Sequence, residues 1–115
     1  MREVKFRGKS LNTGMWVYGD LQHKGKRAFI EYEVAPATIG QFTGLRDKNG
    51  KEVYEGDIVE WENLMKRTMR SVVRYIYNGF KFTDLDGEWQ EVWSYTFEVI
   101  GNIYDNPEIL KGGEQ

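Results

Sequence analysis

The fold is decided by the stretch Gln41-Phe-Thr-Gly-Leu-Arg-Asp-Lys-Asn-Gly-Lys-Glu-Val-Tyr-Glu-Gly-Asp-Ile-Val-Glu-Trp61. Its centre, Asp47-Lys48-Asn49-Gly50, predicts a hairpin loop with glycine where the backbone needs a positive φ. A few residues on, Tyr54-Glu55-Gly56-Asp57 predicts a type II turn in which Gly56 has the same role. The β-branched and aromatic residues that follow favour a strand. Two sharp turns this close together indicate a small, strongly bent β-barrel.

Acidic residues are densest just after the first turn of this stretch. The cluster consists of Glu55, Asp57, Glu60 and Glu62. A general acid/base pair or a divalent cation site would need two of these carboxylates to converge. Strand alternation instead places Asp57 and Glu60 on opposite sides of the chain. We therefore assign structural roles in turns, and no catalytic or metal-binding role, to Asp47, Asn49, Gly50, Gly56 and Asp57.

Composition limits the kind of protein further. With 115 residues, the chain forms one compact domain or two small lobes that share a core. Four Trp, seven Tyr and six Phe favour β structure, and thirteen Gly indicate frequent tight turns. Cysteine is absent, which excludes a disulfide frame and a cysteine nucleophile. A net charge of −2 provides no global attraction to nucleic acid. With no signal-peptide core and no apolar run of membrane-spanning length, we expect a soluble chain without a membrane partner.

Alternation of apolar and polar residues predicts a series of short strands. Val4 and Phe6 alternate with charged residues, which is the pattern of a half-buried strand. Further strands are expected at 15–20, 28–34, 57–62, 71–77, 89–93 and 97–103. Within 28–34, the residues Ile30, Tyr32 and Val34 should share one face. The segment 23–26, which contains the single histidine, should be a polar loop tip. Asn78-Gly79 predicts a hairpin turn, residues 62–70 form at most a short helix, and 106–110 form a helical turn.

Two groups of residues are candidates for an interaction surface. One consists of large aromatic residues: Trp61, Trp89 and Trp93. The other is the best basic patch of the chain: Lys66, Arg67, Arg70 and Arg74. Tyr75, Tyr77, Phe80 and Phe82 follow that patch, and rings beside basic loops can stack bases and hold phosphates. The alternative is that most of these rings are core. No enzyme chemistry is indicated, because His23 has no partner nearby and the glycines lack phosphate-loop spacing.

Three blocks of the sequence resemble the YopX-like proteins, a family encoded by bacteriophages and prophages. The blocks are 2–8 with 13–20, then Thr38-Ile-Gly-Gln-Phe-Thr-Gly-Leu-Arg-Asp-Lys-Asn-Gly50 with 54–59, and finally 97–110. The resemblance implies a mostly β protein whose C-terminal part is an SH3-like barrel. It also implies a phage-derived protein of the bacterial cytoplasm. It implies no known activity, cofactor or catalytic residue.

The sequence therefore predicts a mainly β protein of two parts. Residues 1–45 form an N-terminal β lobe and residues 46–115 an SH3-like barrel with a short C-terminal helical turn; the alternative is one continuous domain. The predicted function is a non-enzymatic binding or assembly module without a cofactor. Its partner is a second copy of itself or a host or phage protein. The alternative function is an accessory nucleic-acid-binding protein that uses basic residues 66–74 and exposed aromatic rings.

Overall fold

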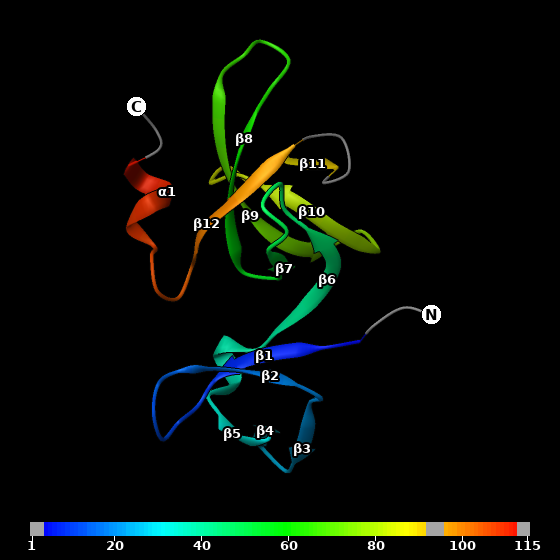
Figure 1. Cartoon of the computed structure of the whole chain (residues 1–115), viewed down its shortest axis with the longest axis vertical. Helices are drawn as coiled ribbons and strands as arrows, with labels where there is room; N and C mark the ends of the chain where they lie inside the picture. The colour runs from blue at the N-terminus through cyan, green and yellow to red at the C-terminus, as the bar shows by residue number, and fades with distance from the viewer. Residues whose placement is uncertain (1–3, 92–95, 113–115) are drawn as a thin grey trace.

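The computed structural model describes residues 4–91 and 96–112, which form two β-rich lobes joined by one strand (Figure 1). The N-terminal lobe contains β1 (Phe6–Lys9), β2 (Trp16–Gly19), β3 (Gln22–Lys24), β4 (Arg27–Ile30), β5 (Tyr32–Val34) and the short 3-10 helix η1 (Pro36–Thr38). The joining strand is β6 (Gly40–Arg46). The C-terminal lobe contains β7 (Glu52–Tyr54), β8 (Asp57–Glu62), β9 (Thr68–Ile76), β10 (Gly79–Thr83), β11 (Trp89–Glu91), β12 (Phe97–Asn102) and α1 (Glu108–Gly112). The prediction of a mainly β protein is confirmed.

The strands form three antiparallel sheets. One sheet has the order β2-β1-β6-β7, a second the order β11-β10-β9-β8-β12, and a third the order β3-β4-β5. The joining strand β6 pairs with β1 at Gly40 and Gln41 and with β7 from Phe42 onward. The same strand thus belongs to both lobes, and it fixes their arrangement through backbone hydrogen bonds.

The C-terminal lobe is an open sheet in the part of the chain that the structure describes. Its outer strands are β11 and β12. The free side of β12 is met by a turn instead of another strand, because Lys48 N–H donates to Phe97 O and Val99 N–H donates to Asp47 Oδ2. Neither the strongly bent barrel that the two turns predicted nor the SH3-like barrel that the family resemblance implied is therefore confirmed.

Apolar side chains gather in three clusters. The inner face of the five-stranded sheet carries the largest: Val53, Val59, Trp61, Val73, Phe82, Phe97 and Val99. On the opposite, outer face, Leu110 of α1 packs on Ile58 and Val72. Ala28, Ile30 and Val34 form the core of the N-terminal lobe. Burial on both faces of the large sheet explains why β8 has buried residues in succession.

The strand predicted at 28–34 is wrong, because the chain reverses within it. Glu31 has φ 63, and β5 folds back so that Tyr32 lies opposite Ile30. Tyr32 is therefore exposed instead of sharing the buried face of Ile30 and Val34. A single left-handed residue is enough to convert one expected strand into a tight hairpin.

Three other predicted boundaries change. The loop that we placed at Asn78-Gly79 is formed by Tyr77 and Asn78, both with positive φ, so it lies one residue earlier. His23 is paired with Ala28 inside the β3–β4 hairpin instead of lying at its tip. The short helix considered within 62–70 is replaced by the β8–β9 hairpin. Of the strand predicted at 89–93, β11 covers residues 89–91, and the rest lies outside the described residues.

Candidate functional site

Part of the outer face of the five-stranded sheet extends beyond α1. The helix covers the β8 and β9 end of this face, where Arg70 Nη1 also donates to Ile109 O at 3.1 Å. Farther along, strand register places Arg74 opposite Lys81 and Lys81 opposite Glu91. We call this region the outer-face cluster, which consists of Arg74, Tyr77, Lys81, Trp89 and Glu91.

Two exposed rings and one buried cation dominate the outer-face cluster. The ring centroids of Tyr77 and Trp89 are 5.8 Å apart, and these side chains are 75% and 41% exposed. Lys81 is buried with its Nζ 5.5 Å from the centroid of the Trp89 ring and 3.3 Å from Glu91 Oε1. A lysine ammonium at this distance from a ring is attracted to its face, which adds a contact between Lys81 and Trp89. The cluster can pack against an apolar or aromatic group, and its buried lysine is held in an ion pair with Glu91.

The predicted aromatic candidates separate in the structure. Trp61 lies in the core, 6% exposed, and its Nε1–H donates to Ser71 Oγ at 3.0 Å. Its ring packs in the main core cluster on the inner face of the sheet, so it is not available to an external partner. Trp93 lies outside the described residues. Trp89 is the candidate that the structure places at the surface.

The predicted basic patch is also not one surface. Lys66 and Arg67 lie in the loop of the β8–β9 hairpin, far along the strand from Arg74. Arg70 lies between these positions, but its Nε donates to Glu60 Oε2 at 3.0 Å. This pairing balances its charge. Lysine and arginine residues that are close in sequence are thus spread along the length of β9.

The predicted turn residues organise the start of the C-terminal lobe. Gly50 and Gly56 have φ of 82 and 94, and Asn49 lies in the first turn. Asp47 accepts hydrogen bonds from the N–H groups of Asn49, Lys51 and Val99, each at 2.9 Å. Burial opposes ionisation of this carboxyl, but the three bonds outweigh burial and lower the pKa of Asp47. Its role is to fasten the turn to β12.

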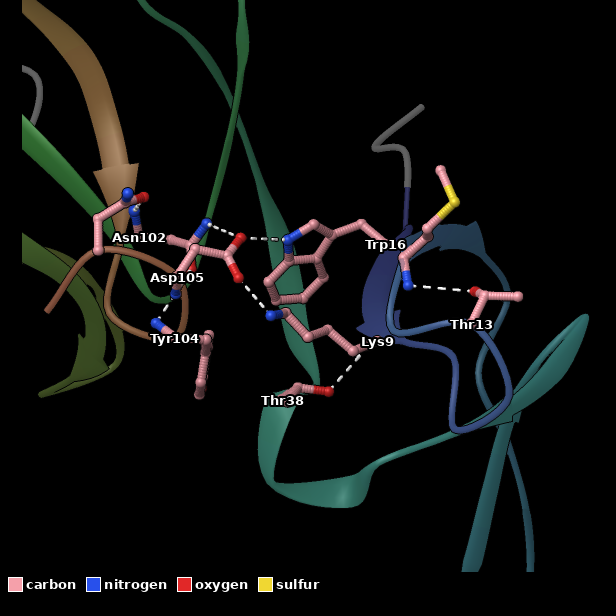
Figure 2. A network of polar contacts seen from close by, with 9 residues as sticks. Lys9, Thr13, Trp16, Thr38, Asn102, Tyr104 and Asp105 are labelled. Carbon is pink, nitrogen blue, oxygen red and sulfur yellow. Dashed lines mark hydrogen bonds and ion pairs between the residues drawn. The ribbon is translucent and has the colours of Figure 1, made fainter.

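Asp105 connects the lobes from the loop between β12 and α1 (Figure 2). Its carboxylate accepts a hydrogen bond from Trp16 Nε1 at 2.8 Å and one from Asn102 Nδ2 at 3.1 Å, and it forms an ion pair with Lys9. Hydrogen bonding from Lys9, then from Trp16, lowers the pKa of Asp105 to about 2. The Trp16 ring also packs edge-on against Tyr104, with centroids 5.8 Å apart.

A second inter-lobe contact is the buried pair of Arg7 and Asp57. Arg7 Nη2 lies 2.8 Å from Asp57 Oδ1, and the two side chains are 6% and 2% exposed. The guanidinium is held between the rings of Trp16 and Tyr54, at 4.5 and 5.0 Å from their centroids. Burial raises the pKa of Asp57, and Arg7 opposes that effect. No substrate can reach groups buried this deeply, so the pair is architectural.

The sequence analysis missed both inter-lobe contacts. Alternation in the first strand suggested that Val4 and Phe6 face the core, yet Val4 is 57% exposed and Arg7 is buried. Arg7 points at the other lobe, where its partner Asp57 lies fifty residues later in the chain. A contact between residues so far apart in sequence leaves no local pattern from which it could be predicted. Lys81 was missed as well, although its position between Phe80 and Phe82 places it on the face opposite the core.

The described residues contain no group of His, Cys, Asp and Glu side chains arranged to hold a metal ion. Within the same residues, no helix has the length and apolar character needed to cross a membrane.

Fold and surface together define a class: a two-lobed antiparallel β protein with an exposed aromatic surface and no gathered catalytic groups in its described residues. The family described as YopX protein matches residues 3–111, and the chain belongs to this family. The crystal structure of protein EF1440 from Enterococcus faecalis is similar, with 25% sequence identity and a TM-score of 0.62. That likeness covers 96% of this chain and 99% of EF1440. No curated protein matches the chain.

Proposed function

We propose that the chain is a non-enzymatic binding or assembly module of phage or prophage origin that acts through protein contacts. The observation that carries this proposal is the exposed pair of Tyr77 and Trp89 on the outer face of the sheet. Tyrosine and tryptophan are enriched among the residues that dominate protein interfaces, because each buries a large ring with little loss of conformational entropy.

The charges around this pair favour a protein over a polyanion. Lys81 is buried and paired with Glu91, so its charge is largely balanced where the rings are exposed. Two of the four carboxylates in the acidic cluster are engaged in ion pairs: Asp57 pairs with Arg7, and Glu60 pairs with Arg70. These engagements support a non-enzymatic role. The SH3-like character of the C-terminal lobe and a cytoplasmic location belong to the same proposal, and both are supported by the family resemblance.

Affinity capture tests this function. The parent chain and a variant with Tyr77→Ser and Trp89→Ser are immobilised and exposed to extracts of prophage-induced bacterial cells. We expect the parent to enrich a protein that the variant does not. Leu85→Ser is the matched control, because Leu85 is 54% exposed in a neighbouring turn outside the cluster. Equal enrichment by parent and ring variant would contradict the assignment of the surface.

Nucleic-acid binding is the second candidate, and one observation favours it. Arg74 is exposed beside Tyr77 and Trp89, and it forms no ion pair with any described residue. Exposed rings and an unpaired cation are the elements of a single-strand binding surface. Retention on single-stranded DNA and RNA columns tests it. This candidate requires retention that weakens as salt rises and that Arg74→Ala reduces.

A further inference from the structure

The hairpin formed by β8 and β9 projects from the C-terminal lobe (Figure 1). Two apolar residues, Leu64 and Met65, lie in its loop. Leu64 is 93% exposed and Met65 is 74% exposed. We call residues 63–67 the hairpin tip. Two adjacent apolar residues at the end of a projecting hairpin contribute nothing to a core of their own chain.

Hydrogen bonds within the hairpin tip hold its loop in one conformation. Asn63 Oδ1 accepts hydrogen bonds from the N–H groups of Met65 and Arg67, at 2.9 and 3.0 Å. Two backbone bonds, from Asn63 N to Arg67 O and from Lys66 N to Asn63 O, close the same loop. Because the loop is already ordered, a contact made by Leu64 and Met65 loses little conformational entropy.

The charge of the hairpin tip is positive. Lys66 and Arg67 are exposed, and neither forms an ion pair with any described residue. A surface that receives this tip therefore needs an apolar floor for Leu64 and Met65 and an acidic group at its edge.

The chain itself offers such a surface between its lobes. A hollow of about 550 Å³ is lined by Val4, Gln41, Glu55 and Tyr75. The lining is mixed: Val4 and Tyr75, which are 57% and 51% exposed, contribute its apolar part, and polar atoms contribute the larger share. Glu55 is the one charged residue among these lining residues, and it is acidic. The volume lies within the range of roughly 300–1,000 Å³ that holds drug-sized ligands, so two aliphatic side chains fit.

We propose that the hairpin tip of one copy of this chain binds in the inter-lobe hollow of a second copy. Leu64 and Met65 contact Val4 and Tyr75, and the cations of the tip face Glu55. The proposal rests on the proposed function, since it names the partner of a binding module. The tip and the hollow are different surfaces, so two copies close as a two-fold pair that makes the contact twice, whereas a head-to-tail arrangement closes as a ring. An anionic membrane is disfavoured, because stable anchoring takes more apolar area than two side chains provide.

Light scattering over a dilution series, from about 1 to 100 µM, measures the association directly. We expect a mass above the 13.5 kDa of the chain that falls on dilution. A tip variant, Leu64→Asp with Met65→Asp, and a hollow variant, Glu55→Lys, should each weaken association by about tenfold or more. Leu85→Asp is the control, because it places one aspartate on an exposed leucine outside the hairpin tip. An equimolar mixture of the tip and hollow variants should recover association, since one intact tip and one intact hollow remain.

A charge exchange tests the pairing itself. Lys66→Glu with Arg67→Glu should weaken association, and adding Glu55→Lys to that variant should restore it. A parent that stays monomeric throughout overturns the proposal, as does a mixture that fails to associate while the parent does. Tip-dependent binding to phosphatidylserine-containing vesicles by a monomeric parent overturns it in favour of a membrane. The capture experiment with Tyr77→Ser and Trp89→Ser uses another surface, so its outcome judges the proposed function separately.

Discussion

At the scale of single residues, the buried pair of Arg7 and Asp57 makes each of its partners depend on the other. Both charges are almost fully removed from water, and Arg7 Nε has no hydrogen-bond acceptor among the described residues. The rings of Trp16 and Tyr54 compensate part of that desolvation through their faces. Asp57 has a second role, because its Oδ2 accepts the N–H of Tyr54 at 2.7 Å and closes the turn before β8.

Removing one charge of the Arg7–Asp57 pair should lower the unfolding free energy more than removing both charges. Asp57→Asn keeps an oxygen for the Tyr54 N–H but leaves a buried guanidinium without its counter-charge, so we expect a loss of about 3–5 kcal/mol in unfolding free energy. Adding Arg7→Met should recover most of that loss, since the methionine needs no charge partner. Urea denaturation of the parent, both single variants and the double variant measures the cycle. Additive losses would show that the two side chains act independently.

At the scale of elements, the loop between β12 and α1 is organised around Asn102. Its Oδ1 accepts the N–H groups of Tyr104 and Asp105, at 3.0 and 2.9 Å, and its Nδ2 donates to Asp105. The loop therefore presents Asp105 to Lys9 and Trp16 of the other lobe (Figure 2). A segment without regular structure thus serves as the fastening between lobes.

Asp105 should make the stability of the protein depend on acid pH. Its pKa is lowered to about 2 from 3.8, so its contribution is present above the ordinary value and is lost as pH falls toward 2. We expect Asp105→Asn to be less stable than the parent at pH 6 and to lose less stability than the parent on acidification. The pKa of Asp57 is raised, so its protonation changes stability in the opposite direction. Because Asp57 is present in both the parent and Asp105→Asn, it does not affect the difference between them. Urea midpoints across this range check the prediction.

Asp20→Asn is the control for this comparison, since it removes an exposed carboxylate that has no ion pair in the described part of the chain. If Asp105→Asn and the parent lose stability in parallel on acidification, Asp105 does not carry the inter-lobe contact.

Local sequence signals correctly predicted two turns, whose backbone conformation depends on the residues within each turn. The turns with glycine at Gly50 and Gly56 carry their own conformational requirement, and both have positive φ. The reversal at Glu31 was not predictable in the same way, because glutamate has no preference for that backbone region. Burial of Arg7 depends on a residue of the other lobe, and the outer-face cluster depends on the register of β9, β10 and β11. Long-range pairing of this kind leaves no periodic signal in one sequence. The division at residue 45 stays a prediction.

At the scale of the whole molecule, charged and aromatic contacts unite the lobes. Three basic residues at alternate positions in and just before β1 form ion pairs with acidic residues of the C-terminal lobe. Lys5 pairs with Glu52 at 2.6 Å, Arg7 with Asp57, and Lys9 with Asp105. Tyr18 and Tyr54 add a ring contact at 5.5 Å.

We expect the lobes to unfold together. Fluorine NMR of protein labelled with 5-fluorotryptophan reports on Trp16 in the N-terminal lobe and Trp61 in the C-terminal lobe within one sample. In urea the two signals should have the same midpoint, because the lobes share a strand and three ion pairs. Combining Asp57→Asn with Asp105→Asn should separate the midpoints. Separate midpoints in the parent itself would mean that the lobes are independent folding units.

The shared strand β6 has a consequence for how such proteins can change over evolution. A flexible linker tolerates insertions, but β6 carries the hydrogen bonds of one sheet at Gly40 and Gln41 and of another from Phe42 onward. An inserted residue between these two sets would invert every later side chain of the strand and rotate one lobe against the other. The strand therefore fixes the spacing between the lobes, and its length should be constant among relatives.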